Sequence, residues 1–259
     1  MAIERIRIGG VYWRESGFSH IQRYNFAREY VSGQVLDIAC GVGYGSYVLS
    51  WRAKHVTGVD VSGEAIAEAA AQHQRPNILF HHGDLASLPA NPAEFDAAVC
   101  LETIEHLSDP VAFLRLLHAR LKPGGRLVIS APNTLQHQRA VPPQPNEYHL
   151  SEPTYEQFQG WLAGLFAVEE EWEQCRILAP GMDFIEPLVR SGAGIAQLAV
   201  IRLLARWEGA VRRLLGKPLP SAFVAAPERG GLIADTVMLP LLPGRRDTAH
   251  TFVLIGRKM

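Results

Sequence analysis

Apolar runs and helix signals alternate along most of the chain. Five apolar runs have the length of buried strands, and they cover residues 34–40, 55–61, 77–85, 95–102 and 126–133. Helix signals occupy the segments between them, at 41–52, 62–74 and 108–121. Strands that alternate with helices in this way predict parallel β–α–β units, and therefore an open α/β sheet with helices on both faces.

The same patterns continue on both sides of this core. Ile21, Tyr24, Phe26 and Tyr30 have the spacing of one helix face, and Gly33 is placed as a helix C-cap. After the fifth strand, the pattern predicts a helix over 154–166, a strand over 167–175 and a last strand over 250–258. The predicted organisation is an N-terminal helical segment (1–33), a core (34–179), a helical insertion (180–246) and the last strand of the core (247–259).

The predicted insertion contains a basic amphipathic pattern over residues 190–217. Six basic residues stand against one acid, Glu208, so this segment carries +5 and the rest of the chain −6. Apolar residues share one face of a helical wheel, and Arg202, Arg206 and Arg213 share the other. Three interpretations remain open: a helix packed on the sheet, a lid over a substrate pocket, and peripheral contact of 195–215 with a membrane. Glu208 intrudes on the apolar face and weakens the third interpretation.

Charge and cysteine content argue against several classes of protein. The 259 residues have a net charge of −1, so nothing global attracts DNA and we expect no DNA partner. The three cysteines are isolated, which argues against a disulfide framework. No apolar run has the length of a membrane span, and the N-terminus lacks the apolar stretch of a signal peptide. We therefore expect a cytoplasmic enzyme, whose oligomeric state the sequence does not indicate.

The most informative stretch is LDIACGVGYGS, at residues 36–46, where a strand turns into a helix. Gly41, Gly43 and Gly45 allow a tight turn and the close approach of a ligand to the backbone. A dinucleotide site requires glycine or alanine at the position of Ser46, so a dehydrogenase is disfavoured. Three alternate glycines after an acid, here Asp37, are instead typical of S-adenosylmethionine sites. A tight turn that binds no ligand is the alternative.

Two further acids support a cofactor site. Asp60 follows the second strand, where a carboxylate can accept both hydroxyls of a ribose. Asp84 follows the third strand, where it can accept from an adenine amino group while the amide of Leu85 donates to a ring nitrogen. Because the carboxyl ends of parallel strands meet at one edge of a sheet, we expect these groups to converge. The predicted cofactor-binding residues are Asp37, Gly41, Gly43, Asp60, Val61, Asp84, Leu85 and Leu101.

As a set, these motifs resemble the class I S-adenosylmethionine-dependent methyltransferases. The matching stretches are VLDIACGVGYGS, VTGVDVS, HHGDLASLP, FDAAVCLETIEHLSDP and LKPGGRLVISAPN, with a looser match over 146–158. The resemblance implies a Rossmann-like, seven-stranded, mostly parallel sheet whose last strand is antiparallel, and methyl transfer from the cofactor's sulfonium to a nucleophile. The N-terminal segment resembles the part that covers the cofactor in related enzymes. His20 and Arg23 are candidates to meet the cofactor's carboxylate, or else are solvated helix residues.

The stretch ETIEH, at 102–106, follows the fourth strand, next to the expected position of the transferable methyl group. Glu102, Glu105 and His106 fall at i, i+3 and i+4, so one helical turn would place them on one face. In a first interpretation, Glu102 packs near the cofactor and His106 is a general base. In a second, these residues and His149 bind Mg²⁺ or Mn²⁺, as implied by a resemblance to small-RNA 2′-O-methyltransferases. In a third, the acids begin a helix and His106 only packs there.

The stretches ETIEHL and NEYHLSE resemble those of methyltransferases that act on hydroxyls of sugars, glycans and secondary metabolites. His106 and His149 are therefore the predicted catalytic residues, and a small-molecule or glycan hydroxyl is the predicted acceptor. One alternative is an RNA 2′-O-methyltransferase with a Glu/His metal site, although the basic residues concentrate in one predicted helix. Another is a non-catalytic cofactor-binding protein, in which replacing His106 would leave cofactor binding unchanged.

Overall fold

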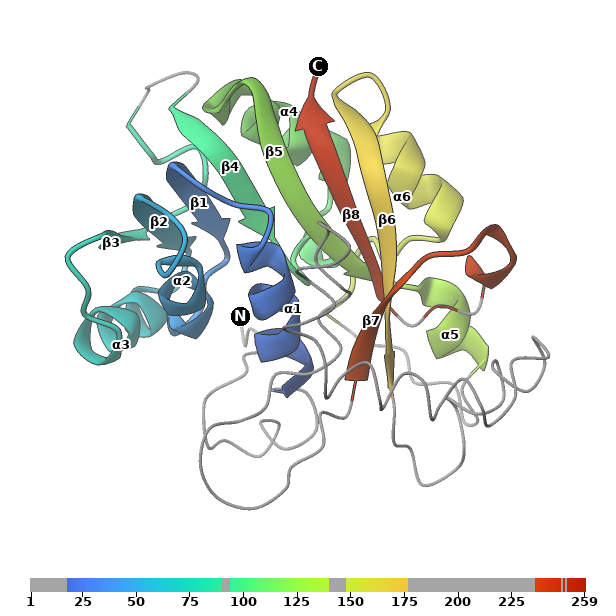
Figure 1. Ribbon diagram of the computed structural model, residues 1–259, viewed down its shortest axis with the longest axis horizontal. Coiled ribbons are helices and arrows are strands. Elements are labelled where there is room, and N and C mark those ends of the chain that lie inside the picture. The colour runs from blue at the N-terminus through green and yellow to red at the C-terminus, as the bar shows by residue number, and fades with distance from the viewer. Residues whose placement is uncertain (1–17, 90–93, 140–147, 177–235, 248, 250) are drawn as a thin grey trace, which may run out of the picture.

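The computed structural model describes residues 18–89, 94–139, 148–176, 236–247, 249 and 251–259, which form one sheet with helices around it (Figure 1). The strands are β1 Gln34–Ile38, β2 His55–Asp60, β3 Ile78–His82, β4 Phe95–Cys100, β5 Leu121–Pro132, β6 Phe166–Arg176, β7 Thr236–Pro240 and β8 Thr251–Lys258. The helices are α1 Phe18–Arg28, α2 Tyr44–Leu49, α3 Gly63–Gln72, α4 Pro110–Arg120, α5 Thr134–Arg139 and α6 Tyr155–Leu162, with 3-10 helices η2 Ile104–His106 and η3 Pro243–Arg245. None of these described helices is long and apolar enough to cross a membrane.

The sheet is parallel in its first half and antiparallel in its second. Its strand order is β3-β2-β1-β4-β5-β8-β6-β7. Strands β1 to β5 pair in parallel, whereas β8 runs antiparallel between β5 and β6. The predicted Rossmann-like fold with an antiparallel last strand is confirmed, and the described sheet has one strand more than the seven expected.

The additional strand, β7, comes from the range predicted as a helical insertion. Residues 180–235 of that range lie outside the described residues, and with them the basic pattern over 190–217 and the predicted membrane contact over 195–215. The end of the range pairs antiparallel with β6, and Met238 on β7 is fully buried. This strand could not be predicted from the sequence, because its stability comes from pairing with a strand far away in the chain, which a local pattern does not record.

Several predicted helix ends are confirmed by their capping groups. Ser62 caps α3, since its hydroxyl accepts from the backbone N–H of Ala65. Thr154 and Gln157 form a reciprocal capping box at the start of α6. In contrast, β5 begins at Leu121 rather than at 126, so residues 122–125 (KPGG) lie inside a strand, beside a register shift against β4.

Each face of the sheet has its own hydrophobic cluster. On one face, Leu36 of β1 belongs to a cluster with residues of α4 and α6, and Leu114 and Phe158 are fully buried there. On the other face, Val35 belongs to a cluster with residues of α1, α2 and α3. This alternation along β1 explains why the central strands are predominantly apolar, since both faces of each strand are covered.

Helix α1 packs directly on the glycine turn, beside α2 and β7 (Figure 1). A Cβ atom added to Gly45 would lie 2.1 Å from the ring of Tyr24. The Tyr24 ring has little room to move, because it is 4 % exposed and its hydroxyl donates to Asp37 at 3.0 Å. The glycine at position 45 is therefore required by the close approach of α1.

Replacing Gly45 by alanine is expected to lower the free energy of unfolding by about 2 kcal/mol, because the added methyl group overpacks this contact. Urea unfolding followed by circular dichroism measures the change. Gly160→Ala in α6 is the matched control, since a Cβ atom there meets no described atom within 4 Å. The control is expected to gain up to about 1 kcal/mol from helix propensity. Equal stability of the two variants would contradict the proposed packing of α1.

Candidate functional site

The glycine turn between β1 and α2 leaves its backbone open at one point. Gly41 and Gly43 have positive φ angles of 54° and 84°. A Cβ atom at Gly43 would lie 2.7 Å from Ala69 and Phe80, so that glycine is needed for packing. A Cβ atom at Gly41 would meet no described atom within 4 Å. A ligand can therefore approach the backbone at Gly41, as the sequence predicts.

Asp60 joins the end of β2 to this turn. One carboxylate oxygen accepts from the backbone N–H of Gly41 at 2.9 Å, and the other accepts from that of Ser62 at 2.8 Å. The residue is half-buried, so its remaining lone pairs can still reach a ligand. Val61, directly after it, is 59 % exposed although apolar. The two residues together offer a polar and an apolar contact at the carboxyl end of β2.

The end of β3 lies beside the end of β2, as predicted. The N–H of Gly83 donates to the carbonyl of Asp60 at 2.9 Å. Asp84 is exposed, and one of its carboxylate oxygens accepts from the N–H of Ser87 at 2.8 Å. Leu85 and Leu101 are 5 % and 6 % exposed, so their side chains belong to the core. Only their backbone groups could take part in binding, and whether they do stays a prediction.

Asp37 faces the interior of the protein. It is fully buried, and its two carboxylate oxygens accept from the hydroxyls of Tyr24 at 3.0 Å and Ser46 at 2.6 Å. Burial raises the pKa of Asp37 to about 7, against the opposing effect of these two hydrogen bonds. Asp37 therefore connects α1 to the start of α2 through hydrogen bonds. The sequence had predicted that Asp37 contacts a cofactor directly.

The raised pKa of Asp37 predicts a pH dependence of stability. A carboxyl group with a higher pKa in the folded state stabilises the fold below its unfolded pKa of about 4, and this contribution is lost as the pH rises through about 7. Between pH 5 and pH 8, the wild type is expected to lose about 2.5 kcal/mol of unfolding free energy relative to Asp37→Asn, which cannot ionise. Urea unfolding of both proteins at the two pH values measures the difference. A constant difference would contradict the assignment.

Glu102 does not lie on one helical turn with Glu105 and His106, so this part of the prediction is wrong. It precedes η2 and has a φ angle of +49°, which is left-handed. Its N–H donates to the Ser130 hydroxyl at 3.0 Å, and that hydroxyl donates back to its carboxylate at 2.8 Å. Its other carboxylate oxygen lies 3.6 Å from the guanidinium of Arg23, which is 4 % exposed. These contacts direct Glu102 towards α1 and β5 and away from the predicted metal cluster.

Glu105, His106 and His149 are brought together although they come from two distant segments. Each offers a ligand atom within 4.8 Å of the others, and the two imidazole centroids are 4.9 Å apart. Glu105 is 1 % exposed, and its Oε2 atom has no hydrogen-bond partner among the described residues. Burial, and next the carboxylate of Glu102, raise the pKa of Glu105 well above its usual range. Three of the four predicted metal ligands thus form one cluster.

The tautomer of His106 follows from its hydrogen bond. Its Nδ1 atom lies 2.9 Å from the carbonyl oxygen of Tyr148. Because a carbonyl oxygen can only accept, Nδ1 carries the proton and Nε2 keeps its lone pair. The side chain is 34 % exposed and its Nε2 atom lies 3.9 Å from Glu105. His106 can therefore act as a base or as a metal ligand.

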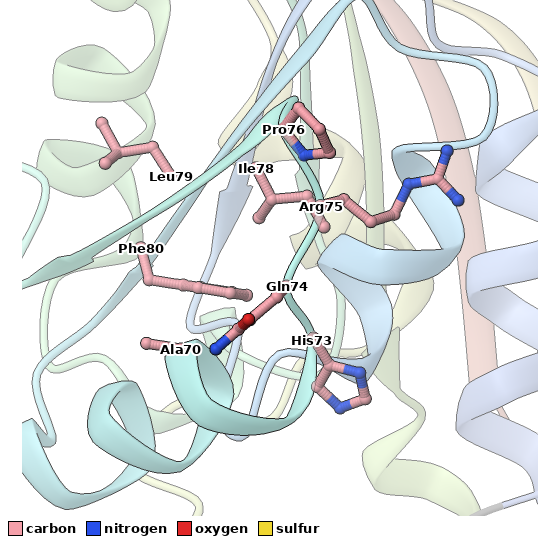
Figure 2. A pocket seen from close by; sticks show the side chains of 8 residues that line it. All are labelled: Ala70, His73, Gln74, Arg75, Pro76, Ile78, Leu79 and Phe80. Carbon is pink, nitrogen blue, oxygen red and sulfur yellow. The ribbon is translucent and has the colours of Figure 1, made fainter.

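The pocket in Figure 2 lies away from this cluster, between the end of α3 and the start of β3. It is lined by Ala70, His73, Gln74, Arg75, Pro76, Ile78, Leu79 and Phe80. The guanidinium of Arg75 stacks on the Trp51 ring at 4.2 Å. In an open α/β sheet, ligands bind at the carboxyl ends of the strands. Because this pocket is at the opposite end of β3 from Asp84, we do not assign it to the cofactor.

The geometry agrees with the comparison to protein families. Residues 36–129 match the family described as "Methyltransferase domain". This part of the chain is similar to methyltransferase domains. The matched range contains the glycine turn, Asp60, Asp84 and the ETIEH stretch.

Individual proteins extend this comparison. The chain is 34 % identical over 118 residues to a probable S-adenosylmethionine-dependent methyltransferase of Mycolicibacterium smegmatis, covering 46 % of this chain and 45 % of that protein. It is 36 % identical over 104 residues to the ubiquinone biosynthesis O-methyltransferase of Pseudomonas aeruginosa, covering 39 % and 44 %. The chain thus spans less than half the length of these relatives. The solved YcgJ protein of Bacillus subtilis shares the fold, with a TM-score of 0.54, 18 % identity, and 92 % and 99 % coverage.

Proposed function

We propose that the protein transfers a methyl group from S-adenosylmethionine to a hydroxyl of a sugar or another small polar metabolite. The orientation of His106 carries this proposal, because the Tyr148 carbonyl fixes the proton on Nδ1 and leaves the Nε2 lone pair available. A neutral imidazole in that state is a suitable general base for a hydroxyl. The names of the ubiquinone O-methyltransferase relatives support transfer to oxygen.

The residues of the glycine turn and the strand ends bind the cofactor in this proposal. Asp60 accepts from the ribose hydroxyls while it holds the N–H of Gly41, and Val61 contacts the adenine ring. Asp84 accepts from the adenine amino group. The cofactor's sulfonium supplies the methyl group. Since this group needs only an aligned nucleophile, much of the rate comes from holding the acceptor beside His106.

A divalent metal is a further part of the proposal. Glu105, His106 and His149 would hold it, and the buried, unpartnered Oε2 atom of Glu105 fits such a role. Two imidazoles and one carboxylate suit Mn²⁺ better than Mg²⁺, which prefers oxygen ligands. A bound ion would lower the pKa of a coordinated hydroxyl. His106 would then act as a ligand, whereas without a metal it acts as the base.

The testing experiment combines binding and transfer. Calorimetry with S-adenosylhomocysteine measures cofactor binding. Methyl-labelled S-adenosylmethionine is then incubated with the protein and fractionated cell extract, with and without EDTA, and label is counted in the small-molecule, lipid and RNA pools. Label in the small-molecule pool is the expected result. Its loss with EDTA supports the metal, and its persistence supports His106 as a metal-free base. Label confined to RNA, or binding without any label, would overturn the proposed acceptor or the proposed catalysis.

A further inference from the structure

Residues 148–152 are docked on η2 by their own hydrogen bonds. The N–H of Ser151 donates to the carbonyl of Glu105 at 2.9 Å. The hydroxyl of Ser151 donates to the carbonyl of Ile104 at 3.0 Å. Ile104 is itself fully buried in the core. The segment is therefore held in a fixed position against the residues that carry Glu105 and His106.

This segment also orients the second imidazole of the cluster. The Nδ1 atom of His149 lies 3.2 Å from the Oε2 atom of Glu152, and both side chains are 11 % exposed. A carboxylate can only accept, so the pair places the ring proton on Nδ1 and leaves the lone pair on Nε2. The rings of His149 and His106 meet edge to face, at an interplanar angle of 78°. In both imidazoles of the cluster, Nδ1 therefore donates a hydrogen bond to an oxygen atom of residues 148–152.

We propose that Glu152 is a positioning residue that fixes the tautomer of His149, with the ring proton on Nδ1. The inference rests on the proposed function, because the tautomer matters only where His149 binds a metal or assists proton transfer. A carboxylate on the second nitrogen of a histidine fixes the ring and makes it a stronger ligand, and losing such a partner usually lowers metal affinity about 10- to 100-fold.

The test uses Glu152→Ala, with the protein ¹⁵N-labelled at histidine. Imidazole nitrogen shifts at pH 8.5 report the tautomer of His149 without metal, cofactor or acceptor. The wild type is expected to give the Nδ1–H tautomer, and the variant to give averaged shifts, because a free imidazole populates both tautomers. Titration with Mn²⁺ alone is the second readout. The variant is expected to bind it about 10- to 100-fold more weakly.

Two further variants complete the experiment. Glu156→Ala removes the same charge from the exposed first turn of α6 and is expected to leave both readouts unchanged. Glu152→Gln serves if the alanine variant fails to fold; its amide offers both a donor and an acceptor, so averaged His149 shifts are again expected. Wild-type His149 shifts in the Glu152 variants would overturn the inference. Absence of S-adenosylhomocysteine binding by the wild type would overturn the proposed function, and the tautomer readout would still decide the role of Glu152.

Discussion

Replacing His106 by alanine is expected to reduce methyl transfer about 10²- to 10⁴-fold, which is the usual contribution of a positioned general base. The reason is the Nε2 lone pair, which the hydrogen bond from Nδ1 to the Tyr148 carbonyl keeps available. Label transfer to the small-molecule pool, measured as an initial rate at saturating S-adenosylmethionine, gives the change. Cofactor affinity is expected to stay within about threefold, because the described side-chain partners of His106 are Tyr148, Glu105 and His149.

The control for this prediction is His55→Ala. His55 is exposed and begins β2, so it lies at the amino end of the strand, away from the cluster. We expect this variant to have the wild-type rate. If His106→Ala also kept the wild-type rate, His106 would be neither base nor ligand, and its side chain would only pack there.

The second large effect is expected at Asp60. The carboxylate of Asp60 accepts from the backbone N–H groups of Gly41 and Ser62. Asparagine at this position removes the negative charge and places an amide donor opposite one of these N–H groups. Hydrogen bonds to a charged group contribute about 1.5–3 kcal/mol each. We therefore expect S-adenosylhomocysteine to bind about 100-fold more weakly, as measured by calorimetry.

Asp109→Asn is the matched control for Asp60. Asp109 caps α4 by accepting from the N–H of Ala112, and asparagine is an equally good N-cap. The control is expected to bind S-adenosylhomocysteine as the wild type does. Wild-type affinity of Asp60→Asn would place the ribose elsewhere and would remove the main support for the predicted cofactor site.

The central strands could be predicted because their signal is local. Strands β1 and β4 are buried on both faces, so each is predominantly apolar, with Asp37 and Asp96 as the exceptions inside them. Strand β7 could not be predicted in the same way. It is short and pairs with β6 on one side only within the described sheet, and the residues that support it are distant in sequence.

The candidate site shows the same division between local and distant causes. The order of strands and helices was enough to predict the convergence of Asp60 and Gly41. The left-handed backbone of Glu102 was not predictable, because it is held by Ser130, which is 28 residues away. The partner of His149 was not predicted. Glu152 follows His149 at i+3, and this spacing could have indicated the pair.

The pairing at the end of β6 and β7 has a consequence for how this protein can change. Arg176 and Thr236 are register partners, so the end of β6 and the start of β7 lie at neighbouring backbone positions. A two-residue hairpin turn can connect such partners. A segment of another length or sequence can therefore be inserted between Arg176 and Thr236, in evolution or by engineering, while the order of the strands is kept. Such an insertion would leave the cluster of Glu105, His106 and His149 in place.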